Sequence, residues 1–301
     1  MSKGKIWLQA ARLRTLPLSF SGIFTGTAMA LYNNAFDGLI FTLALLTTLG
    51  FQVLSNFAND YGDGVKGTDN AERIGPQRAL QSGLLTVKEL KRGMLITIIF
   101  TLVVATFLIY VAFGSENFVY TITFFVLGIA SIVAAIKYTV GQSAYGYRAL
   151  GDVFVFLFFG LLGVVGSYFL YTKTLSVWIF LPAITIGLMS VAVLNLNNMR
   201  DRVSDKASGK KTIAVILGFE KSKTYHFFVL GTAYASAFIF FFYMNNDSWL
   251  RFLPLLAFFP ILVHLKKVQF IRLPKDFDPE LKKVALSTFL FSLLFLLTAL
   301  A

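Results

Sequence analysis

The chain has 301 residues, of which 56 % are hydrophobic and only 14 % are charged. A soluble domain usually carries about 25 % charged residues, so this composition excludes an ordinary soluble fold. The absence of cysteine and the presence of only two histidines argue against thiolate metal sites, histidine zinc sites and Ser-His-Asp catalysis. The net charge of +12 would suggest nucleic acid in a soluble protein. Here the basic residues lie between apolar runs, so we attribute the charge to membrane topology and expect no nucleic-acid partner.

Apolar runs of spanning length recur along the chain, and a bilayer-spanning helix needs about 20 such residues. The pattern predicts an all-α polytopic membrane protein with a single domain over 1–301. We expect about nine transmembrane helices, at 16–33, 38–58, 93–113, 118–136, 152–172, 176–196, 224–244, 249–265 and 284–301. The eighth of these segments contains Pro254 and Pro260, which predict a kink.

The basic residues predict the orientation of these spans. Loops on the cytoplasmic side of a membrane protein are enriched in Lys and Arg. Of the 27 Lys and Arg residues, only Lys173 and Arg251 fall in loops on the side opposite the N-terminus. We therefore expect the N-terminus in the cytoplasm and the C-terminus outside.

Two long loops on the inner side, over 59–92 and 197–223, begin with clustered acids. The acids are Asp60, Asp63 and Asp69 in the first loop, and Asp201 and Asp205 in the second. Each cluster is preceded by asparagines, and the two lie four spans apart, as a repeated four-helix unit would require. We expect two four-helix pseudo-repeats plus one helix, with both loops acting as cytoplasmic active-site loops.

The spacing of the acids places oxygen atoms on shared helix faces, because residues four apart lie on one side of a helix. This relation holds within Asn56 and Asp60, within Asn59 and Asp63, and within Asn197, Asp201 and Asp205. Carboxylate and amide oxygens suit Mg²⁺, which usually keeps substrate phosphates among its ligands. We predict that these residues and Asp69 bind Mg²⁺, with Asp60, Asp63, Asp201 and Asp205 as the catalytic acids. The alternative is that they are solvated loop acids paired with nearby Lys and Arg.

Basic residues near the clusters are candidates for binding a diphosphate, because guanidinium groups match phosphate oxygens. They are Lys66, Arg73, Arg78, Arg148, Arg200 and Lys211, among which Arg78 and Arg148 are favoured. The alternative for each of them is contact with lipid headgroups. Asp152 begins the fifth span and either caps that helix, pairs with Arg148 or lines a substrate pocket.

The motif Asn59-Asp60-x-x-Asp63 with the later Asp69, together with Asp201-x-x-x-Asp205, resembles the UbiA superfamily of membrane prenyltransferases. Within that superfamily, the stretches from Trp7 to Pro17, Arg73 to Arg78, Gly151 to Gly160 and Asp278 to Glu280 resemble the 1,4-dihydroxy-2-naphthoate polyprenyltransferase branch. The wider superfamily has an acid four residues after the position of Asp63. Here that position is Gly67 and the acid follows at Asp69, as in the naphthoate branch.

The resemblance implies an enzyme of the bacterial inner membrane that binds polyprenyl diphosphate, 1,4-dihydroxy-2-naphthoate and Mg²⁺. The expected reaction transfers the prenyl chain with loss of CO₂ and diphosphate, and gives demethylmenaquinol for menaquinone synthesis. A 4-hydroxybenzoate or homogentisate acceptor is the enzymatic alternative. An ion-coupled transporter is the alternative of another class, although its acids should lie near the bilayer midplane.

Aromatic faces are expected to stabilise an allylic cation formed in this reaction. Candidates at the right membrane depth are Tyr61, Tyr138, Tyr147, Phe154 and Phe158, and we assign Tyr138, Tyr147 and Asp152 to the substrate pocket. His226 and His264 have no evident acidic partner in the sequence and are predicted to be bystanders.

Overall fold

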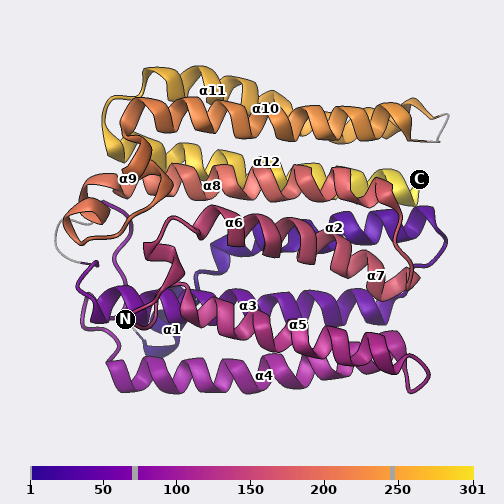
Figure 1. Cartoon of the computed structure of the whole chain (residues 1–301), viewed down its shortest axis with the longest axis horizontal. Helices are drawn as coiled ribbons and strands as arrows, with labels where there is room; N and C mark the ends of the chain where they lie inside the picture. Colours follow the sequence, from indigo (N-terminus) through magenta and orange to yellow (C-terminus); the bar gives the residue numbers. More distant parts are fainter. Residues whose placement is uncertain (1, 70–73, 245–247) are drawn as a thin grey trace.

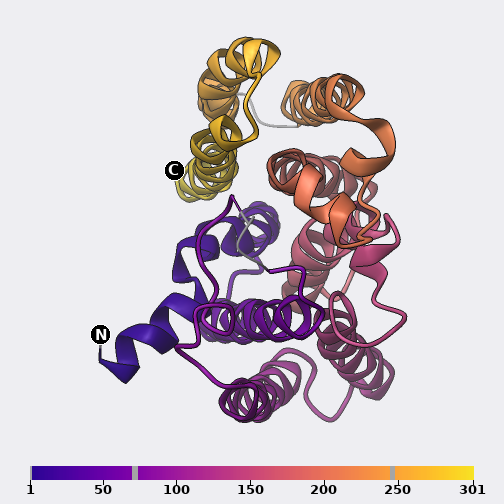
Figure 2. The same ribbon diagram turned by 90° about the vertical axis from the view of Figure 1, so that its left-hand side faces the viewer.

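The structure is a computed structural model that describes residues 2–69, 74–244 and 248–301. Helices form almost all of it, and the extended pairing in this part of the chain is an isolated bridge between Arg148 and Lys211. The long helices run along one common direction, with the two chain ends at opposite ends of the bundle (Figure 1). The view along the helices shows the N-terminal helices in the lower half and the C-terminal helices in the upper half (Figure 2).

Each predicted span corresponds to a helical stretch. In order, these are α2 (Leu16–Tyr32), α3 (Gly38–Val65), α4 (Val87–Phe113), α5 (Phe118–Lys137), α6 (Gly151–Val155) with η3 (Phe156–Gly166) and α7 (Ser167–Thr172), η4 (Val177–Ile179) with α8 (Phe180–Ala207), α10 (Phe219–Tyr243), η5 (Trp249–Phe258) with α11 (Phe259–Phe270), and η6 (Pro274–Asp276) with α12 (Phe277–Leu300). Among the described residues, eight of these stretches are long and apolar enough to cross a membrane, and α2 is shorter at 17 residues. The remaining elements are α1 (Lys3–Ala11), η1 (Leu13–Thr15), η2 (Tyr145–Tyr147) and α9 (Ile213–Leu217).

Large apolar side chains lie exposed along the outer spans, which is the surface expected of a bundle surrounded by lipid. Phe118 is 70 % exposed, Phe228 is 72 % exposed and Phe259 is 62 % exposed. By contrast, 61 % of the most apolar window of η4 and α8 is buried, against 17 % in α5. The helix that carries the second acidic motif is therefore central in the bundle, where its polar end can meet other elements.

Close helix packing shapes the middle of the bundle. A Cβ atom on Gly160 would lie 2.8 Å from the Cα atom of Gly187 and 2.7 Å from the carbonyl oxygen of Ala183. These glycines allow η3 to pack directly on the backbone of α8. Half of this span, Phe156–Gly166, is π-helical, a wider winding that often occurs at functional sites.

Both motif helices continue beyond the predicted spans, to Val65 in α3 and to Ala207 in α8. The predicted span ends at 58 and 196 mark the change from apolar to polar residues, which does not stop a helix. The helices end just before Gly67 and Gly209, whose positive φ values of 71° and 74° suit glycine. As a result, four of the five predicted acids stand on helices, and only Asp69 lies in a loop.

The eighth span changes its helical winding along its length. Its first part is the 3-10 segment η5, which contains Pro254, and α11 begins at Phe259 with Pro260 in its first turn. Proline cannot donate a backbone hydrogen bond inside a helix, which explains the change of winding.

The interpretation of His264 as a residue without an acidic partner was wrong. His264 Nδ1 lies 2.7 Å from the buried carboxylate of Glu280 on α12. His226 on α10 contacts His264 through the two Nε2 atoms, which are 2.8 Å apart. Sequence spacing could not reveal this cluster, because its members come from three different helices.

Candidate active site

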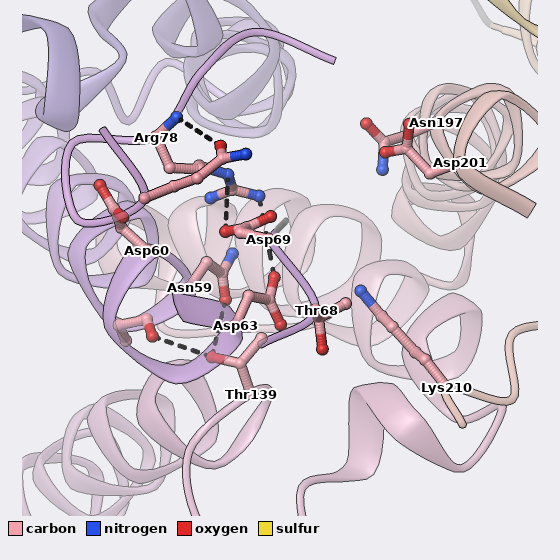
Figure 3. A network of polar contacts seen from close by, with 12 residues as sticks. Asn59, Asp60, Asp63, Thr68, Asp69, Arg78, Thr139, Asn197, Asp201 and Lys210 are labelled. Carbon is pink, nitrogen blue, oxygen red and sulfur yellow. Dashed lines mark hydrogen bonds and ion pairs between the residues drawn. The ribbon is translucent and has the colours of Figure 1, made fainter. Parts of the chain in front are cut away.

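The first acidic motif surrounds the guanidinium of Arg78. Arg78 Nη2 lies 3.8 Å from Asp63 Oδ2, and Arg78 Nε lies 3.5 Å from Asp69 Oδ2. The hydroxyl of Tyr147 donates to Asp63 Oδ1 over 2.8 Å and lies 2.6 Å from the hydroxyl of Thr68. Burial raises the pKa of Tyr147, so this phenol remains a neutral donor. Figure 3 shows Asp63, Asp69 and Arg78 gathered at the end of α3.

The other members of this motif have different partners. Asp60 lies apart from the Asp63 and Asp69 pair (Figure 3), and its two oxygens accept from the backbone amides of Ala79 and Leu80 at 3.0 and 3.2 Å. Asp60 therefore folds the loop that carries Arg78 back onto α3. Asn59 Oδ1 lies 3.4 Å from the hydroxyl of Thr139.

The second motif is organised by Arg200, which is only 3 % exposed. Its Nε donates to Asp201 Oδ1 and its Nη2 to Asp201 Oδ2, both over 2.8 Å. The same Nη2 donates to Asn197 Oδ1 over 2.7 Å, and Nη1 donates to Asp278 Oδ1 over 2.5 Å. The sequence predicts that Arg200 binds diphosphate. In the structure its guanidinium instead binds the carboxylate of Asp201 and the side-chain amide of Asn197.

Lys210, and not its neighbour Lys211 that the sequence predicts, lies near acids of both motifs. Its Nζ lies 3.8 Å from Asp205 Oδ1. Burial would lower the pKa of Lys210, but the negative charges of Asp63 and Asp205 outweigh burial and raise it well above its ordinary value. In Figure 3 the Lys210 side chain points into the space between the first motif and the pair Asn197 and Asp201. Lys210 therefore feels the charge of an acid from each motif, Asp63 from the first and Asp205 from the second.

The remaining basic candidates are less closely engaged. Lys66 Nζ lies 3.9 Å from the centre of the Tyr147 ring, at the edge of the first motif. Arg148 and Lys211 are exposed and meet through their backbones, in the bridge between the two loops. Arg73 lies outside the described residues.

A cavity of about 370 Å³ lies next to the first motif, lined by residues of α2, α3, α4, α5, η2, α6, η3, α7 and α8. Asn56 and Asn59 border its polar end. One wall is a ladder of aromatic rings in the order Tyr138, Tyr145, Phe154 and Phe158, with centroid distances of 5.3, 3.9 and 6.1 Å. Tyr138, a predicted pocket residue, lines this cavity, and so does Tyr145, which the sequence did not single out.

The cavity also has a polar row, contributed by α2 and α3. Ser19 Oγ donates to Gln52 Oε1 over 2.6 Å, and Gln52 Nε2 donates to Thr15 Oγ1 over 3.0 Å. Asn56 continues the row and donates to the carbonyl of Ala11 over 2.8 Å. Ser19, Gln52 and Asn56 all line the cavity, so it offers hydrogen-bonding groups opposite a largely apolar interior.

Two other pocket residues predicted from the sequence do not line this cavity. Tyr147 belongs to the polar cluster above it. Asp152 is buried at the start of α6 and accepts from the hydroxyl of Tyr225 on α10 over 2.9 Å. Tyr61 does not line the cavity either, and Lys91 Nζ lies 5.5 Å from the centre of its ring.

The donor atoms fit a divalent cation that also binds substrate oxygens. In the part of the chain that the structure describes, no three acidic or histidine side chains come close enough to hold an ion by themselves. The two motifs instead present separate groups of carboxylate and amide oxygens around one basic region. Mg²⁺ is commonly held by one or two carboxylates plus phosphate oxygens, so such an incomplete protein site suits it.

Residues 19–298 match the model of the UbiA prenyltransferase family. The chain is 44 % identical to a Haemophilus influenzae protein named 1,4-dihydroxy-2-naphthoate octaprenyltransferase, over 97 % of this chain and 95 % of that protein. It is 41 % identical to the Escherichia coli protein of the same name, over 99 % of this chain and 96 % of that protein.

A solved structure of a UbiA homolog from Archaeoglobus fulgidus, bound to GPP and Mg²⁺, has the same fold with a TM-score of 0.72. The similarity covers 99 % of this chain and 98 % of that one at 15 % identity. The matched residues include both acidic motifs and all the spans that form the cavity. The chain therefore belongs to the UbiA prenyltransferase family.

Proposed function

We propose that this protein transfers a polyprenyl chain from polyprenyl diphosphate to 1,4-dihydroxy-2-naphthoate, with Mg²⁺ as cofactor. Diphosphate and CO₂ leave, and the product is demethylmenaquinol. The observation that carries the proposal is a polar region in which Lys210 lies near an acid of each motif, next to a largely apolar cavity with an aromatic wall. The names of the full-length relatives favour this acceptor over 4-hydroxybenzoate and homogentisate.

The polar region would bind the diphosphate end of the donor. Asp63, Asp69, Asn197, Asp201 and Asp205 would hold Mg²⁺, which supplies positive charge to the leaving diphosphate. Three basic side chains near the acids would add further positive charge for the diphosphate: Lys210, Lys66 and Arg78. Preorganised charge of this kind favours the state in which the bond between C1 and the diphosphate oxygen breaks.

The apolar cavity would receive the first prenyl units and the acceptor ring. The aromatic ladder presents ring faces to C1 as positive charge develops there, and each favourable contact is worth about 0.5–2 kcal/mol. The electron-rich naphthol ring forms the new bond to C1, and loss of its carboxylate as CO₂ restores the aromatic ring. A cavity lined mainly by apolar side chains limits the access of water to this cation.

The polar row of Ser19, Gln52 and Asn56 would orient the acceptor. These residues lie on the α2 and α3 wall of the cavity, where hydroxyl and amide groups can meet the two ring hydroxyls of the naphthoate. Gln52→Leu is expected to raise KM for the naphthoate more than KM for the prenyl diphosphate. An unchanged KM for the naphthoate would remove this role.

The protein is proposed to lie in the bacterial inner membrane with the N-terminus and both acidic motifs facing the cytoplasm. The apolar helices and the full-length bacterial relatives support the membrane, and the uneven distribution of Lys and Arg supports the orientation. The acids lie at the ends of α3 and α8 rather than at mid-span, which disfavours the transporter alternative.

The direct experiment is product mass spectrometry with purified protein, Mg²⁺ and a series of prenyl diphosphates. 1,4-dihydroxy-2-naphthoate, 4-hydroxybenzoate and homogentisate are offered in parallel. We expect a decarboxylated prenyl naphthol from the first acceptor. Product from another acceptor alone would correct the substrate, and no product from any of them would refute prenyl transfer.

A further inference from the structure

The N-terminus of α12 contacts the second acidic motif from a distant part of the chain. Asp278, the second residue of α12, accepts from Arg200 Nη1 over 2.5 Å. The remaining hydrogen bonds of Arg200 go to both oxygens of Asp201 and to Asn197. One guanidinium therefore binds a half-exposed carboxylate on α12 together with two of the proposed metal-binding side chains on α8.

This arrangement creates a competition for the oxygens of Asp201. A bidentate bond to Arg200 uses the same lone pairs that a divalent cation would need. Arg200 is buried, and removing the counter-charge of a buried guanidinium is costly. Asp278 supplies a second counter-charge through a different nitrogen, so Arg200 stays paired when Asp201 turns toward a cation.

The start of α12 is fixed by its own buried contacts. Glu280 is fully buried and lies 2.7 Å from His264 Nδ1, 2.9 Å from Lys267 Nζ and 3.0 Å from Lys283 Nζ. His264 in turn contacts His226 on α10. These contacts hold the first turn of α12 against α10 and α11, two residues after Asp278.

We propose that Asp278 is a positioning residue that keeps Arg200 paired while Asn197 and Asp201 present their oxygens to a divalent cation. The inference rests on the proposed function and extends it to a part of the chain that lies far from both motifs in sequence. The cluster around Glu280 anchors this contact.

The test measures Mn²⁺ binding to the purified full-length protein, with inorganic diphosphate present and no prenyl acceptor. Free Mn²⁺ is quantified by electron paramagnetic resonance, so the readout does not depend on turnover. Removing a residue that orients a metal ligand typically weakens metal binding about 10–100-fold. We expect Asp278→Asn to weaken Mn²⁺ binding about ten-fold, near the lower end of that range, and Asp278→Glu to recover most of the loss.

Asp276→Asn is the matched control, because it removes the same charge two residues earlier. No hydrogen bond or ion pair of the Asp276 side chain is seen in the described part of the chain. It should change Mn²⁺ binding less than two-fold, and both variants should keep a Tm close to that of the wild type.

Equal Mn²⁺ binding by Asp278→Asn and Asp276→Asn would overturn the positioning role, as would a fall in Tm with normal Mn²⁺ binding. Prenyl transfer by the wild type would survive either result. If the wild-type protein binds no Mn²⁺ with diphosphate, both the positioning role and the metal-dependent function are refuted.

Discussion

The acidic motif at the end of α3 and the motif at the end of α8 share their spacing of oxygen donors but are held by different partners. In the first motif, Arg78 comes from the following loop and lies 3.5 Å or more from Asp69 and Asp63. In the second, Arg200 is the neighbour of Asp201 on the same helix, with hydrogen bonds of 2.5–2.8 Å.

This difference suggests different tasks for the two arginines. The Arg78 side chain is also largely enclosed, at 10 % exposed, but its ion pairs are long, so less is lost when its guanidinium moves to a phosphate group. A buried guanidinium with several short hydrogen bonds fixes side chains in place. We therefore expect Arg78 to act on the substrate and Arg200 to act on the protein.

The largest expected effect comes from removing one acid of either motif. Asp63→Ala and Asp201→Ala should each lower kcat/KM for prenyl transfer by about 10³-fold, because both would weaken charge stabilisation of the leaving diphosphate. Glu116→Ala, an exposed acid on the α4–α5 loop, is the control and should retain full activity. Near-normal turnover of either aspartate variant, measured with radiolabelled prenyl diphosphate, would contradict a shared site.

Replacing each arginine by glutamine separates binding of the substrate by Arg78 from positioning of protein side chains by Arg200. Arg78→Gln should raise KM for the prenyl diphosphate by about 10–100-fold, the size expected for a lost charge-assisted hydrogen bond, with little change in Tm. Arg200→Gln should lower Tm by roughly 5–10 °C, because it leaves buried Asp201 without its counter-charge. The same pattern of KM and Tm in both variants would show that the two arginines do not differ.

The aromatic ladder should contribute less than the polar groups. Tyr145→Leu is expected to lower kcat by about 2–30-fold, the range that corresponds to one cation–π contact of about 0.5–2 kcal/mol. Phe242→Leu is a matched control, because Phe242 is also stacked on an aromatic ring but is 55 % exposed on the outside of α10. A kcat effect of similar size in both variants would assign it to general packing.

The smallest effect concerns Lys210 and its dependence on pH. Lys210→Met should lower Tm by a few degrees in EDTA, because repulsion between carboxylates of the two motifs increases, and Mg²⁺ should reduce the difference.

Folding raises the pKa of Lys210 above its ordinary value of 10.5. Its stabilisation is therefore complete below pH 10.5 and is lost only as pH rises through the folded pKa. Thermal shift assays should show a constant difference from pH 6 to pH 9, and a difference that disappears below pH 9 would be inconsistent with this pairing.

Local sequence patterns were sufficient to predict where the spans lie and which acids share a helix face. Apolar runs of spanning length and the spacing of Asn197, Asp201 and Asp205 are local features, and the structure places that triad along α8. The partners of the acids could not be predicted in this way. Spacing alone does not distinguish Lys210 from Lys211, although packing places only the first between the motifs.

Contacts between elements far apart in the sequence could not be predicted from local patterns either. Asp278 and Arg200 are 78 residues apart in sequence, and Glu280 meets His264 only because α11 and α12 pack together. The cavity, too, requires the arrangement of nine helical elements, and no local pattern marks Tyr145 as one of its lining residues.

The most direct test is a double-mutant cycle on the binding of a non-reactive geranyl diphosphate analogue, measured with and without Mg²⁺ for Asp63→Asn, Asp201→Asn and the double variant. If both motifs bind one diphosphate through shared metal, each single variant loses most of the Mg²⁺-dependent affinity. The double variant should then lose little more, with a coupling energy of about 1–3 kcal/mol. Additive losses, or unchanged binding in either single variant, would show that the two motifs do not form one site.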